Sequence, residues 1–471
     1  MSELPTGWAN FRIDEIADYN PKHPKETSDA TPVSFVPMTV IAENSKSIGQ
    51  HGNRPLGQVR KGYTHFADGD VLIAKITPCF ENGKGAIANN LVNGIGCGTT
   101  ELHVLRPSGV VLKEYLYYFL HREQFRKQAK TKMTGTAGQL RVPSDYLKSI
   151  ELPLPPLNEQ KRIVAKLDEL LPKVEACKER LQKIPAILKR FRQSVLAAAV
   201  SGKLTEEWRI HKGDNTGLSS DDELPESWLR RTIADVIEGL KYGTSVKCTS
   251  EKQGSAVLRI PNIVSGAMEL SNLKYGKLEQ SECEALALKR GDILLIRSNG
   301  SVKLVGRTAL VRKEHEGLAY AGYLIRLRPK TEMIDPEYFN LLFSSTAMRN
   351  QIEIPARSTS GVNNINSEEV RALKLPLPPL DEQVEIVRLV SVLLDRITRL
   401  NHRLETSNRL SQRTIDSILS KAFSDTLVPQ DPNDEPAAVL LERIKQAKAG
   451  EVGGKTRRGR KGKANSRAVT A

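Results

Sequence analysis

Apolar residues recur at alternating spacings of four and three along one long stretch of the chain. The positions of this seam are Ile163, Leu167, Leu170, Val174, Cys177, Leu181, Ile184, Leu188, Phe191 and Val195. Such spacing, held over several heptads, is typical of a coiled-coil helix, because the repeat keeps the apolar residues on one face. One helix cannot bury this face alone, so the pattern predicts a second helix packed against it.

A second seam in the same register begins 223 residues later, at Ile386 instead of Ile163. It weakens at Ser407 and resumes near Leu410 and Ile418, and its main positions are Ile386, Val390, Leu393, Ile397, Leu400 and Leu404. Two such helices with a folded domain between them can bury both seams by packing antiparallel.

Two prolines complicate the first helix. Pro172 and Pro185 lie inside it, and each costs about 3 kcal/mol in a helix interior or bends the helix. We therefore expect a kinked helix or consecutive helices on one line. The second copy has Asp395 and Asn408 at these positions and is expected to be straighter.

The same proline-rich motif precedes each seam. Residues 150–160 read IELPLPPLNEQ, and residues 373–383 read LKLPLPPLDEQ. Consecutive prolines favour extended backbone, and we expect Asn158 and Asp381 to cap the helices that follow.

Further matches show that a whole unit is duplicated. LPTGW at 4–8 corresponds to LPESW at 224–228, and GDVLIAKI at 69–76 corresponds to GDILLIRS at 291–298. The offset between copies stays between 220 and 223 residues. A fixed offset over many motifs predicts an internal repeat.

Each copy has an α/β pattern ahead of its long helix. The runs after Gly-Asp are short and apolar, and ELHVLRP (101–107) and YLIRLRP (323–329) alternate as strands do. We predict an α+β fold of two similar α/β domains separated by two long helices that form an antiparallel coiled coil, a pseudo-two-fold internal repeat. The predicted segments are domains at 1–150 and 224–373, helical spacers at 151–204 and 374–428, a polar linker at 205–223, and a short helix (437–449) with a basic disordered tail in 429–471.

Of the formal net charge of +15, seven charges lie in the tail, and the remaining excess is spread along the chain. The tail 455–467 carries seven basic residues and no acidic one, whereas the domains hold 18 basic against 14 acidic residues in 1–150 and 21 against 17 in 224–373. A modest excess suits contact with phosphates but also serves solubility. The tail either attracts DNA non-specifically or is a dispensable solvated end, and deleting 450–471 would separate these readings through the salt dependence of binding.

The sequence lacks the common catalytic motifs. The sequence has no phosphate-binding G-x-x-x-x-G-K-[ST], no H-E-x-x-H, and no [ND]-P-P-[YF] of an adenine methyltransferase. The Glu159-x-Lys161 pair resembles a nuclease motif but lies at the start of the coiled-coil helix without an upstream Pro-Asp. Eight scattered histidines and five cysteines without C-x-x-C argue against a metal site and for a reducing cytoplasm. With no export signal and no long apolar run, we expect a soluble cytoplasmic protein.

Two pairs of matched polar segments are candidates for DNA contact. One pair follows the Gly-Asp strands, and the other comprises the loops 131–142 and 356–367. Their hydroxyl, amide and basic groups are of the kinds that reach phosphates and base edges, although ordinary solvated loops look similar. The candidates are Lys75, Thr77, Asn82, Lys84, Thr134, Thr136, Gln139, Arg141, Arg297, Ser298, Asn299, Lys303, Arg357, Ser358, Thr359, Asn363 and Asn364.

The duplicated order of these motifs resembles the DNA specificity subunit of type I restriction-modification systems. The resemblance covers about residues 1–428, and EPAAVLLERI at 435–444 also looks like that family's C-terminus. It implies that each α/β domain is a target recognition domain for one half of a split, asymmetric DNA sequence. It further implies that the helices dock two methyltransferase subunits, which use S-adenosylmethionine on adenine N6, and that an ATP- and magnesium-dependent restriction subunit joins through them. This chain would then bind no cofactor and catalyse nothing itself.

Two other readings stay open on the residues alone. A fused methyltransferase or nuclease would methylate or cleave DNA without partners. A stand-alone DNA-binding coiled-coil scaffold would bind its DNA specifically without a methyltransferase. Co-purification and binding assays with and without that partner distinguish all three.

The helix length predicts the spacing of the DNA half-sites. The seam from Ile163 to Val195 spans about 50 Å at about 1.5 Å per residue, and one face of DNA recurs every 34–36 Å or about one turn. Inserting one heptad into both helices should therefore lengthen the unread spacer and leave both half-site sequences unchanged. Mapping of methylated adenines measures this, and an unchanged spacer would contradict a ruler role.

Overall fold

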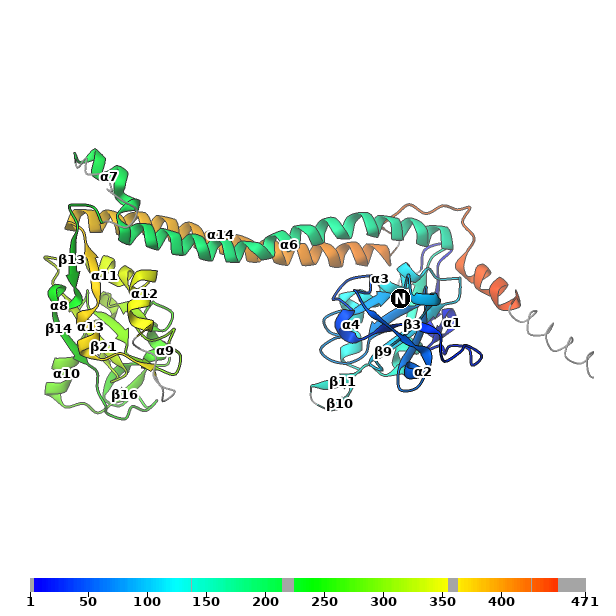
Figure 1. The fold of residues 1–471 in the computed structure, drawn as a ribbon, viewed down its shortest axis with the longest axis horizontal. Helices are drawn as coiled ribbons and strands as arrows, with labels where there is room; N and C mark the ends of the chain where they lie inside the picture. The colour runs from blue at the N-terminus through cyan, green and yellow to red at the C-terminus, as the bar shows by residue number, and fades with distance from the viewer. Residues whose placement is uncertain (1–3, 137, 214–223, 355–362, 425, 448–471) are drawn as a thin grey trace, which may run out of the picture. The chain divides into compact units, whose positions relative to one another are not determined.

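The computed structural model divides into two compact units, each of which joins parts of both repeats. It describes residues 4–136, 138–213, 224–354, 363–424 and 426–447 (Figure 1). Unit 1 comprises residues 1–181 and 407–471, and unit 2 comprises residues 182–406. Unit 1 is thus built from both ends of the chain, whereas unit 2 is one continuous stretch.

The first copy supplies the α/β domain of unit 1 and the first long helix. Its elements are β1 (Ala9–Arg12), α1 (Ile13–Ile16), β2 (Ala17–Tyr19), β3 (Pro32–Val36), η1 (Met38–Val40), β4 (Gly52–Pro55), α2 (Leu56–Val59), β5 (Thr64–Ala67), β6 (Val71–Ala74), β7 (Gly85–Ile87), η2 (Val92–Gly94), β8 (Ile95–Gly98), β9 (Leu102–Pro107), α3 (Lys113–His121), α4 (Glu123–Lys130), β10 (Thr134–Thr136), β11 (Gln139–Arg141), α5 (Ser144–Ser149), β12 (Glu151–Leu154) and α6 (Leu157–Ser201).

The second copy supplies the α/β domain of unit 2 and the second long helix. Its elements are η3 (Lys203–Thr205), α7 (Glu206–His211), β13 (Leu229–Thr232), α8 (Ile233–Val236), β14 (Ile237–Tyr242), β15 (Ser255–Leu258), α9 (Ile260–Ile263), β16 (Lys274–Gly276), α10 (Gln280–Leu286), β17 (Ile293–Ile296), β18 (Ser298–Asn299), β19 (Thr308–Leu310), η4 (Lys313–His315), β20 (Ala319–Tyr320), β21 (Leu324–Pro329), α11 (Pro336–Leu342), α12 (Thr346–Glu353), β22 (Asn363–Asn364), α13 (Ser367–Ala372), β23 (Lys374–Leu377) and α14 (Leu380–Ala422).

The main sheets of the two domains share one topology, whereas the second sheet has four strands in unit 1 (β4-β3-β8-β5) and three in unit 2 (β16-β15-β20). The main sheet has the order β2-β9-β6-β7 in unit 1 and β14-β21-β17-β19 in unit 2. In the second sheet of unit 1, β3 pairs parallel with β8 and antiparallel with β4. In the second sheet of unit 2, β15 pairs parallel with β20 and antiparallel with β16. A short antiparallel pair, β1-β12 or β13-β23, ties the start of each domain to the proline-rich motif. The predicted internal repeat and its mixed α and β content are confirmed.

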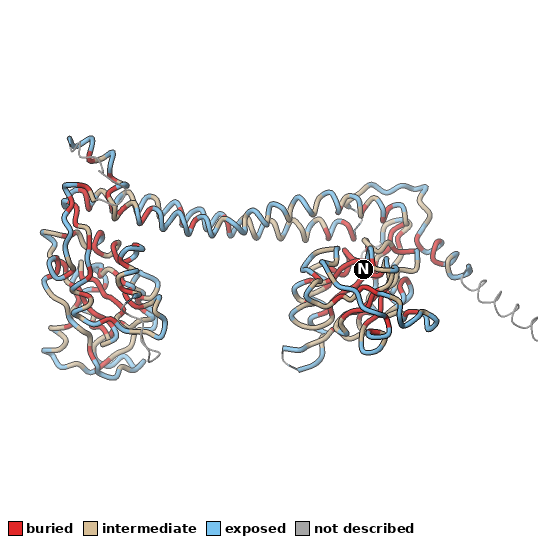
Figure 2. Tube along the Cα trace, in the orientation of Figure 1, coloured by how far each residue is buried: buried red, intermediate tan, exposed pale blue. Residues whose placement is uncertain are grey.

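The central strands explain the apolar runs after Gly-Asp. Val71 and Ile73 face the core cluster that includes the long helices, whereas Leu72 faces a second cluster between the two sheets. In β17, Ile293 and Leu295 likewise face the cluster that includes the long helices, whereas Leu294 and Ile296 face the other cluster. A strand covered on both faces reads as a continuous hydrophobic run rather than an alternating one. Figure 2 shows that buried residues gather inside each domain.

The long helices α6 and α14 pack together and run antiparallel within each unit. In unit 1, Ile163 and Leu167 share a core cluster with Leu419 and Ala422 near the end of α14. In unit 2, residues 195–199 of α6 share a cluster with Ile386 and Val390 near the start of α14. The early part of one helix therefore meets the late part of the other, as the two seams predicted.

Several seam positions differ from the prediction. The expected burial is not observed for Cys177, Phe191, Leu400 and Leu410, which are exposed, the last three by 44%, 47% and 63%. The remaining predicted seam side chains are buried or half-buried, including Leu170, Val174, Leu181, Ile184, Leu188, Leu393, Ile397 and Leu404. In each unit, the seam residues are most deeply buried where the α/β domain packs on the helices, and they are more exposed farther along the helices. Two helices alone leave part of each seam to solvent.

The helix boundaries also correct three predictions. α6 runs as one helix through Pro172 and Pro185, so consecutive helices are excluded; both prolines are exposed, and water can bind the carbonyl groups that lose a helical donor. Asn158 and Asp381 lie inside the first turns of α6 and α14 rather than at their caps. The predicted linker is partly helical, since η3 and α7 occupy residues 203–211. The predicted C-terminal helix is observed over residues 437–447, and the basic tail lies outside the described residues.

The two units differ where the far end of a long helix meets a domain. In unit 1, the Phe423 ring packs on Tyr115 and Phe119 at centroid distances of 4.9 and 5.5 Å, and the Arg122 guanidinium covers both phenylalanines. In unit 2, the matching positions hold the smaller Val200, Leu342 and Ser345, and these line a pocket of about 700 Å³. The contact between the end of the long helix and the domain is therefore filled by aromatic rings in unit 1, whereas in unit 2 it leaves a pocket.

Phe423→Ala should lower the free energy of unfolding by about 3–5 kcal/mol, because it removes a buried ring from a packed cluster. Val200→Ala is the matched control and should cost far less, since its side chain is half-buried beside the pocket. Denaturant unfolding of the full chain measures both. Equal losses would show that the rings of unit 1 do not stabilise it more than the matching residues of unit 2.

Candidate nucleic-acid interface

A buried tryptophan–glutamate contact joins the two ends of the first domain. The indole nitrogen of Trp8 lies 3.2 Å from both carboxylate oxygens of Glu159 in α6 and donates to them. Trp8 comes from the LPTGW motif, and Glu159 comes from the proline-rich motif. Since β1 also pairs with β12, the two motifs form one structural joint.

The second domain repeats this joint, and a buried arginine takes part in it. The Trp228 indole donates to Glu382 at 2.9 Å, and Arg209 of α7 donates to the same carboxylate at 2.5 Å. The side chains of Arg209 and Glu382 are only 3% and 1% exposed. Thr205 supplies a further hydrogen bond to Glu382. The segment that follows α6 therefore closes the joint of unit 2.

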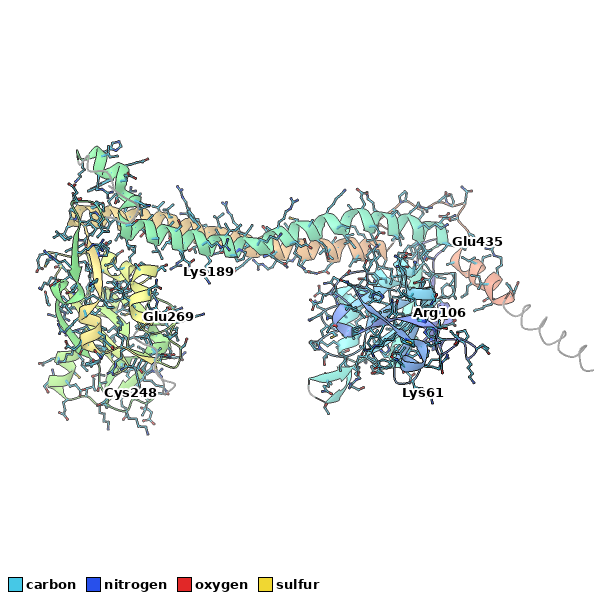
Figure 3. The ribbon with its side chains drawn as sticks, in the orientation of Figure 1. Lys61, Arg106, Lys189, Cys248, Glu269 and Glu435 are labelled. Atoms are coloured by element: carbon cyan, nitrogen blue, oxygen red, sulfur yellow. The ribbon has the colours of Figure 1, made fainter. Side chains whose placement is uncertain are left out.

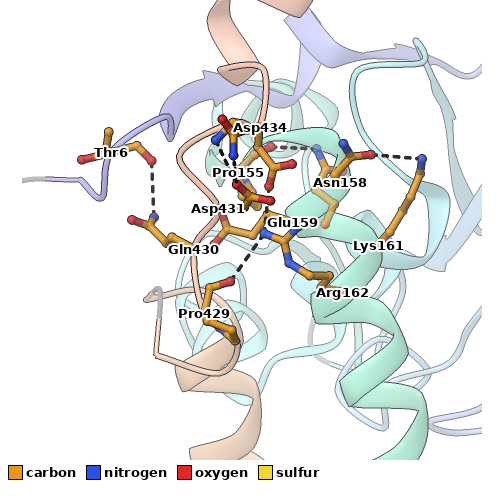
Figure 4. Close-up of polar contacts among 12 residues, drawn as sticks. Thr6, Pro155, Asn158, Glu159, Lys161, Arg162, Pro429, Gln430, Asp431 and Asp434 are labelled. Atoms are coloured by element: carbon orange, nitrogen blue, oxygen red, sulfur yellow. Dashed lines mark hydrogen bonds and ion pairs between the residues drawn. The ribbon is translucent and has the colours of Figure 1, made fainter.

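The segment that follows α14 closes the joint of unit 1 in a different way. Figure 4 shows Arg162 of α6 donating to the Asp434 carboxylate at 2.8 Å and to the Pro429 carbonyl at 3.4 Å. Gln430 donates to the Thr6 carbonyl at 3.3 Å. The C-terminal segment is thus fastened both to the long helix and to the start of the chain.

The glutamine of each motif holds the loop that precedes the first helix after the main sheet, α3 in unit 1 and α11 in unit 2. The Gln160 side chain accepts from the Leu112 amide and donates to the Val110 and Pro155 carbonyls. Gln383 does the same with Asp335, Met333 and Pro378. Both glutamines are fully buried. Together Glu and Gln connect the start of each long helix to two separate parts of its domain.

The Gly-Asp and Leu-Arg-Pro motifs meet across the main sheet. Arg106 donates to both oxygens of Asp70 at 2.7 and 2.8 Å, and Arg328 does so with Asp292 at 2.7 Å for both contacts. Each aspartate also accepts an amide hydrogen bond in its own turn. Because each carboxylate is only 1% exposed, a bidentate arginine is what permits its burial. These matched motifs are structural rather than candidates for DNA contact.

In unit 1 the two candidate segments lie against each other. The Thr77 amide donates to the Leu140 carbonyl, and the Leu140 amide donates to the Thr77 hydroxyl. Gln139 and Arg141 belong to β11, which forms a hairpin with Thr134 and Thr136 of β10. The hairpin residues Thr134, Thr136 and Gln139 are exposed. The structure thus gathers one polar edge from segments about 60 residues apart.

Unit 2 gathers the matching edge. Ser298 and Asn299 of β18 pair with Asn364 and Asn363 of β22. Arg297 donates from Nε to the Asn364 side-chain oxygen at 3.2 Å, and its guanidinium lies 4.6 Å from the Tyr242 ring centroid. The segment after the Gly-Asp strand and the loop before the proline-rich motif therefore converge in both units.

Other candidates are engaged elsewhere or cannot be placed. Asn82 donates to Glu43, and Lys84 donates to the Met38 carbonyl, so both serve contacts within the domain. Lys303 is exposed. Arg357, Ser358 and Thr359 lie outside the described residues.

Two residues of this edge, the charged Glu101 in unit 1 and the aromatic Tyr323 in unit 2, were not predicted. Glu101 accepts from Nε and Nη2 of Arg141 at 3.0 Å each, and these hydrogen bonds hold the pKa of the Glu101 carboxyl below its usual value. Tyr323, at the matching place in unit 2, is 64% exposed. Glu101 and Tyr323 directly precede β9 and β21, in the otherwise matching sequences ELHVLRP and YLIRLRP. The difference in residue type at this one position was the sequence signal that could have identified both residues.

The outer faces of the long helices carry charged side chains. Lys189, for example, is exposed and points away from the helix pair (Figure 3). Among the described residues, no group of three His, Cys, Asp or Glu side chains is placed to hold a metal ion. None of the helices in those ranges is both long and apolar enough to cross a membrane.

Comparison with known proteins defines the class of this duplicated arrangement. A family model described as the type I restriction modification DNA specificity domain matches residues 5–186 and 225–408. The EcoKI specificity subunit of Escherichia coli K12 is 34% identical over 378 residues, covering 78% of this chain and 77% of that subunit. The EcoEI specificity subunit of Escherichia coli is 28% identical over 503 residues, covering 90% and 83%. The chain therefore belongs to the family of type I restriction-modification DNA specificity subunits.

Solved structures agree on the fold. A chain from a structural study of assembly and conformational transition in a type I restriction-modification system has a TM-score of 0.65 at 20% identity, covering 91% of this chain and all of that one. The HsdS subunit from Thermoanaerobacter tengcongensis has a TM-score of 0.59 at 20% identity, covering 90% and 98%.

Replacing Arg209 by Met should destabilise unit 2 by about 3–5 kcal/mol, because Glu382 would remain buried without its cation. Lys212→Met is the control: Lys212 pairs with Asp381, but both side chains are 55% exposed, so the loss should stay within about 1 kcal/mol. Denaturant unfolding followed by tryptophan fluorescence tests this pair. Similar losses for both variants would rule out a special role for the buried pair.

Proposed function

We propose that this chain reads a bipartite, asymmetric DNA target, with one α/β domain for each half. The observation that carries the proposal is the matched polar edge. In both units it is built at the same place from the same two segments, yet it presents different side chains. A repeated scaffold with different edge chemistry suits two related domains that recognise different base sequences.

Basic residues in this edge fit contact with a duplex. Arg141 and Arg297 supply planar groups with several donors, one in each unit, and Thr134 and Thr136 supply exposed hydroxyls in the hairpin that carries Arg141. Arginine and hydroxyl groups bind phosphates and base edges. We assign the described candidates at this edge to DNA contact.

The helix pair would serve assembly. We assign to it the docking of two methyltransferase subunits, one for each repeat, and through them the restriction subunits. The charged outer faces of both helices, with residues such as Lys189, support this role. S-adenosylmethionine, ATP and magnesium would be bound by those partners, and this chain would act in the cytoplasm as a non-catalytic subunit.

The experiment is reconstitution of the full chain with a methyltransferase subunit, followed by single-molecule mapping of methylated adenines. The expected result is one split motif with two different halves and an unread spacer of fixed length. The chain alone should neither methylate nor cleave DNA.

Two outcomes would contradict the proposal. Methylation or cleavage by the chain alone would make it an enzyme. Specific binding of one DNA sequence by the chain alone, unaffected by a methyltransferase, would instead favour a stand-alone DNA-binding scaffold.

A further inference from the structure

We propose that one equivalent position in each unit reads a base: Arg141 reads guanine for unit 1, and Asn364 reads adenine for unit 2. Glu101 and Arg297 are the positioning residues that orient these two readers. The inference rests on the proposed function, because it names the residues and the base class through which that function is performed.

Backbone hydrogen bonds define the position in unit 1. The Lys75 amide donates to the Glu101 carbonyl at 3.0 Å, and the Val142 amide donates to the Lys75 carbonyl at 2.9 Å. Lys75 therefore lies between Glu101 on one side and the end of β11 on the other. Arg141 is the residue just before Val142, in a bridge with Ile76.

The same bonds recur in unit 2. The Arg297 amide donates to the Tyr323 carbonyl at 3.0 Å, and the Ile365 amide donates to the Arg297 carbonyl at 2.9 Å. Asn364 precedes Ile365 and pairs with Ser298. Arg141 and Asn364 are therefore equivalent in the backbone, whereas their side chains differ.

Both readers face away from their domain cores. Val142 and Ile365 belong to the core clusters and are 2% and 0% exposed. Successive side chains along extended backbone point to opposite sides. Arg141 and Asn364 therefore project from the edge that the candidate segments form.

The contacts of Arg141 leave two of its guanidinium hydrogens available. Glu101 accepts from Nε and Nη2, and the Gln139 carbonyl accepts from Nη1 at 3.2 Å. A guanidinium has five N–H donors, so one hydrogen remains on each terminal nitrogen. These two donors suit the O6 and N7 acceptors of guanine, the pair that arginine commonly reads in the major groove. The Glu101 carboxylate fixes the plane of the fork and repels phosphate from it.

The contacts of Asn364 favour a different base. Arg297 donates to its side-chain oxygen, so the amide nitrogen faces the other way. That oxygen retains a second acceptor site, and the amide nitrogen is a donor. An acceptor and a donor side by side match N6 and N7 of adenine. Arg297 is itself held over the Tyr242 ring, which limits its movement.

The test exchanges the readers in the full chain reconstituted with a methyltransferase subunit. Arg141→Asn should reduce methylation at targets with the original guanine about 10- to 100-fold, the range expected for one bidentate base contact, and should favour adenine at that place. Asn364→Arg should make the reciprocal change in the other half-site. Each variant should leave the opposite half-site and the spacer unchanged, and mapping of methylated adenines reports all of these.

The positioning role has a separate readout. Glu101→Gln should lower discrimination between guanine and the other bases at that place, while binding to non-specific DNA changes little. Asp29→Asn is the matched control, because Asp29 pairs with the Arg60 guanidinium at 2.7 Å on the same domain, away from both candidate segments. Arg141→Lys keeps the charge but loses the planar fork, and should lose discrimination even if Arg141→Asn fails to fold.

The outcomes separate this inference from the proposed function. If the wild-type complex methylates no split motif, the proposed function fails. If the wild-type complex methylates a split motif, the proposed function stands. The inference is then overturned by either of two results. One is that Arg141→Lys and Asn364→Arg both keep the original base preference in each half-site, and the other is that the half-site altered by Arg141 variants contains no guanine.

Discussion

The structure depends on the buried carboxylate at the start of each long helix. Glu159 and Glu382 each accept an indole hydrogen bond from a tryptophan that begins the domain more than 150 residues earlier. Without such partners a buried carboxylate would be strongly unfavourable. Each domain is consequently closed on itself at the point where its long helix begins, and the neighbouring glutamine ties in a third segment. This joint fixes the orientation of each long helix relative to its own domain.

Duplication has preserved the main buried polar contacts of the units and changed their polar edges. The buried Asp–Arg pairs, the joints and the two-faced central strands recur with nearly the same distances. At the polar edge, by contrast, Glu101 is replaced by Tyr323 and Arg141 by Asn364 within the same backbone hydrogen bonds. An interior tolerates little change because its groups must be packed and hydrogen-bonded, whereas an exposed edge is open to new chemistry. One scaffold therefore carries two different surfaces.

The sequence predicted the repeat, the strands after Gly-Asp and the two long helices, because each leaves a periodic or repeated pattern. It did not show that Trp8 and Trp228 meet the glutamates of the proline-rich motifs, since long-range pairing has no local signal. Cys177, Phe191, Leu400 and Leu410 were misplaced because heptad spacing fixes a face of a helix but not how much of that face a partner covers. In the candidate interface, sequence matching found the two segments, while the pairing of Arg141 with Glu101 required the register of three strands. Whether these residues contact DNA stays a prediction.

Unit 1 is built from both ends of the chain, and this determines the order in which the molecule can be completed during synthesis. The first domain leaves the ribosome before unit 2, yet Phe423, Leu440 and Leu441, which complete its core, are made after unit 2. Unit 2 is continuous and can close before them. Until these residues are made, Tyr115 and Ile163 lack their final neighbours, so the domain made before unit 2 is finished after it, and a chain truncated between them would expose its apolar surface.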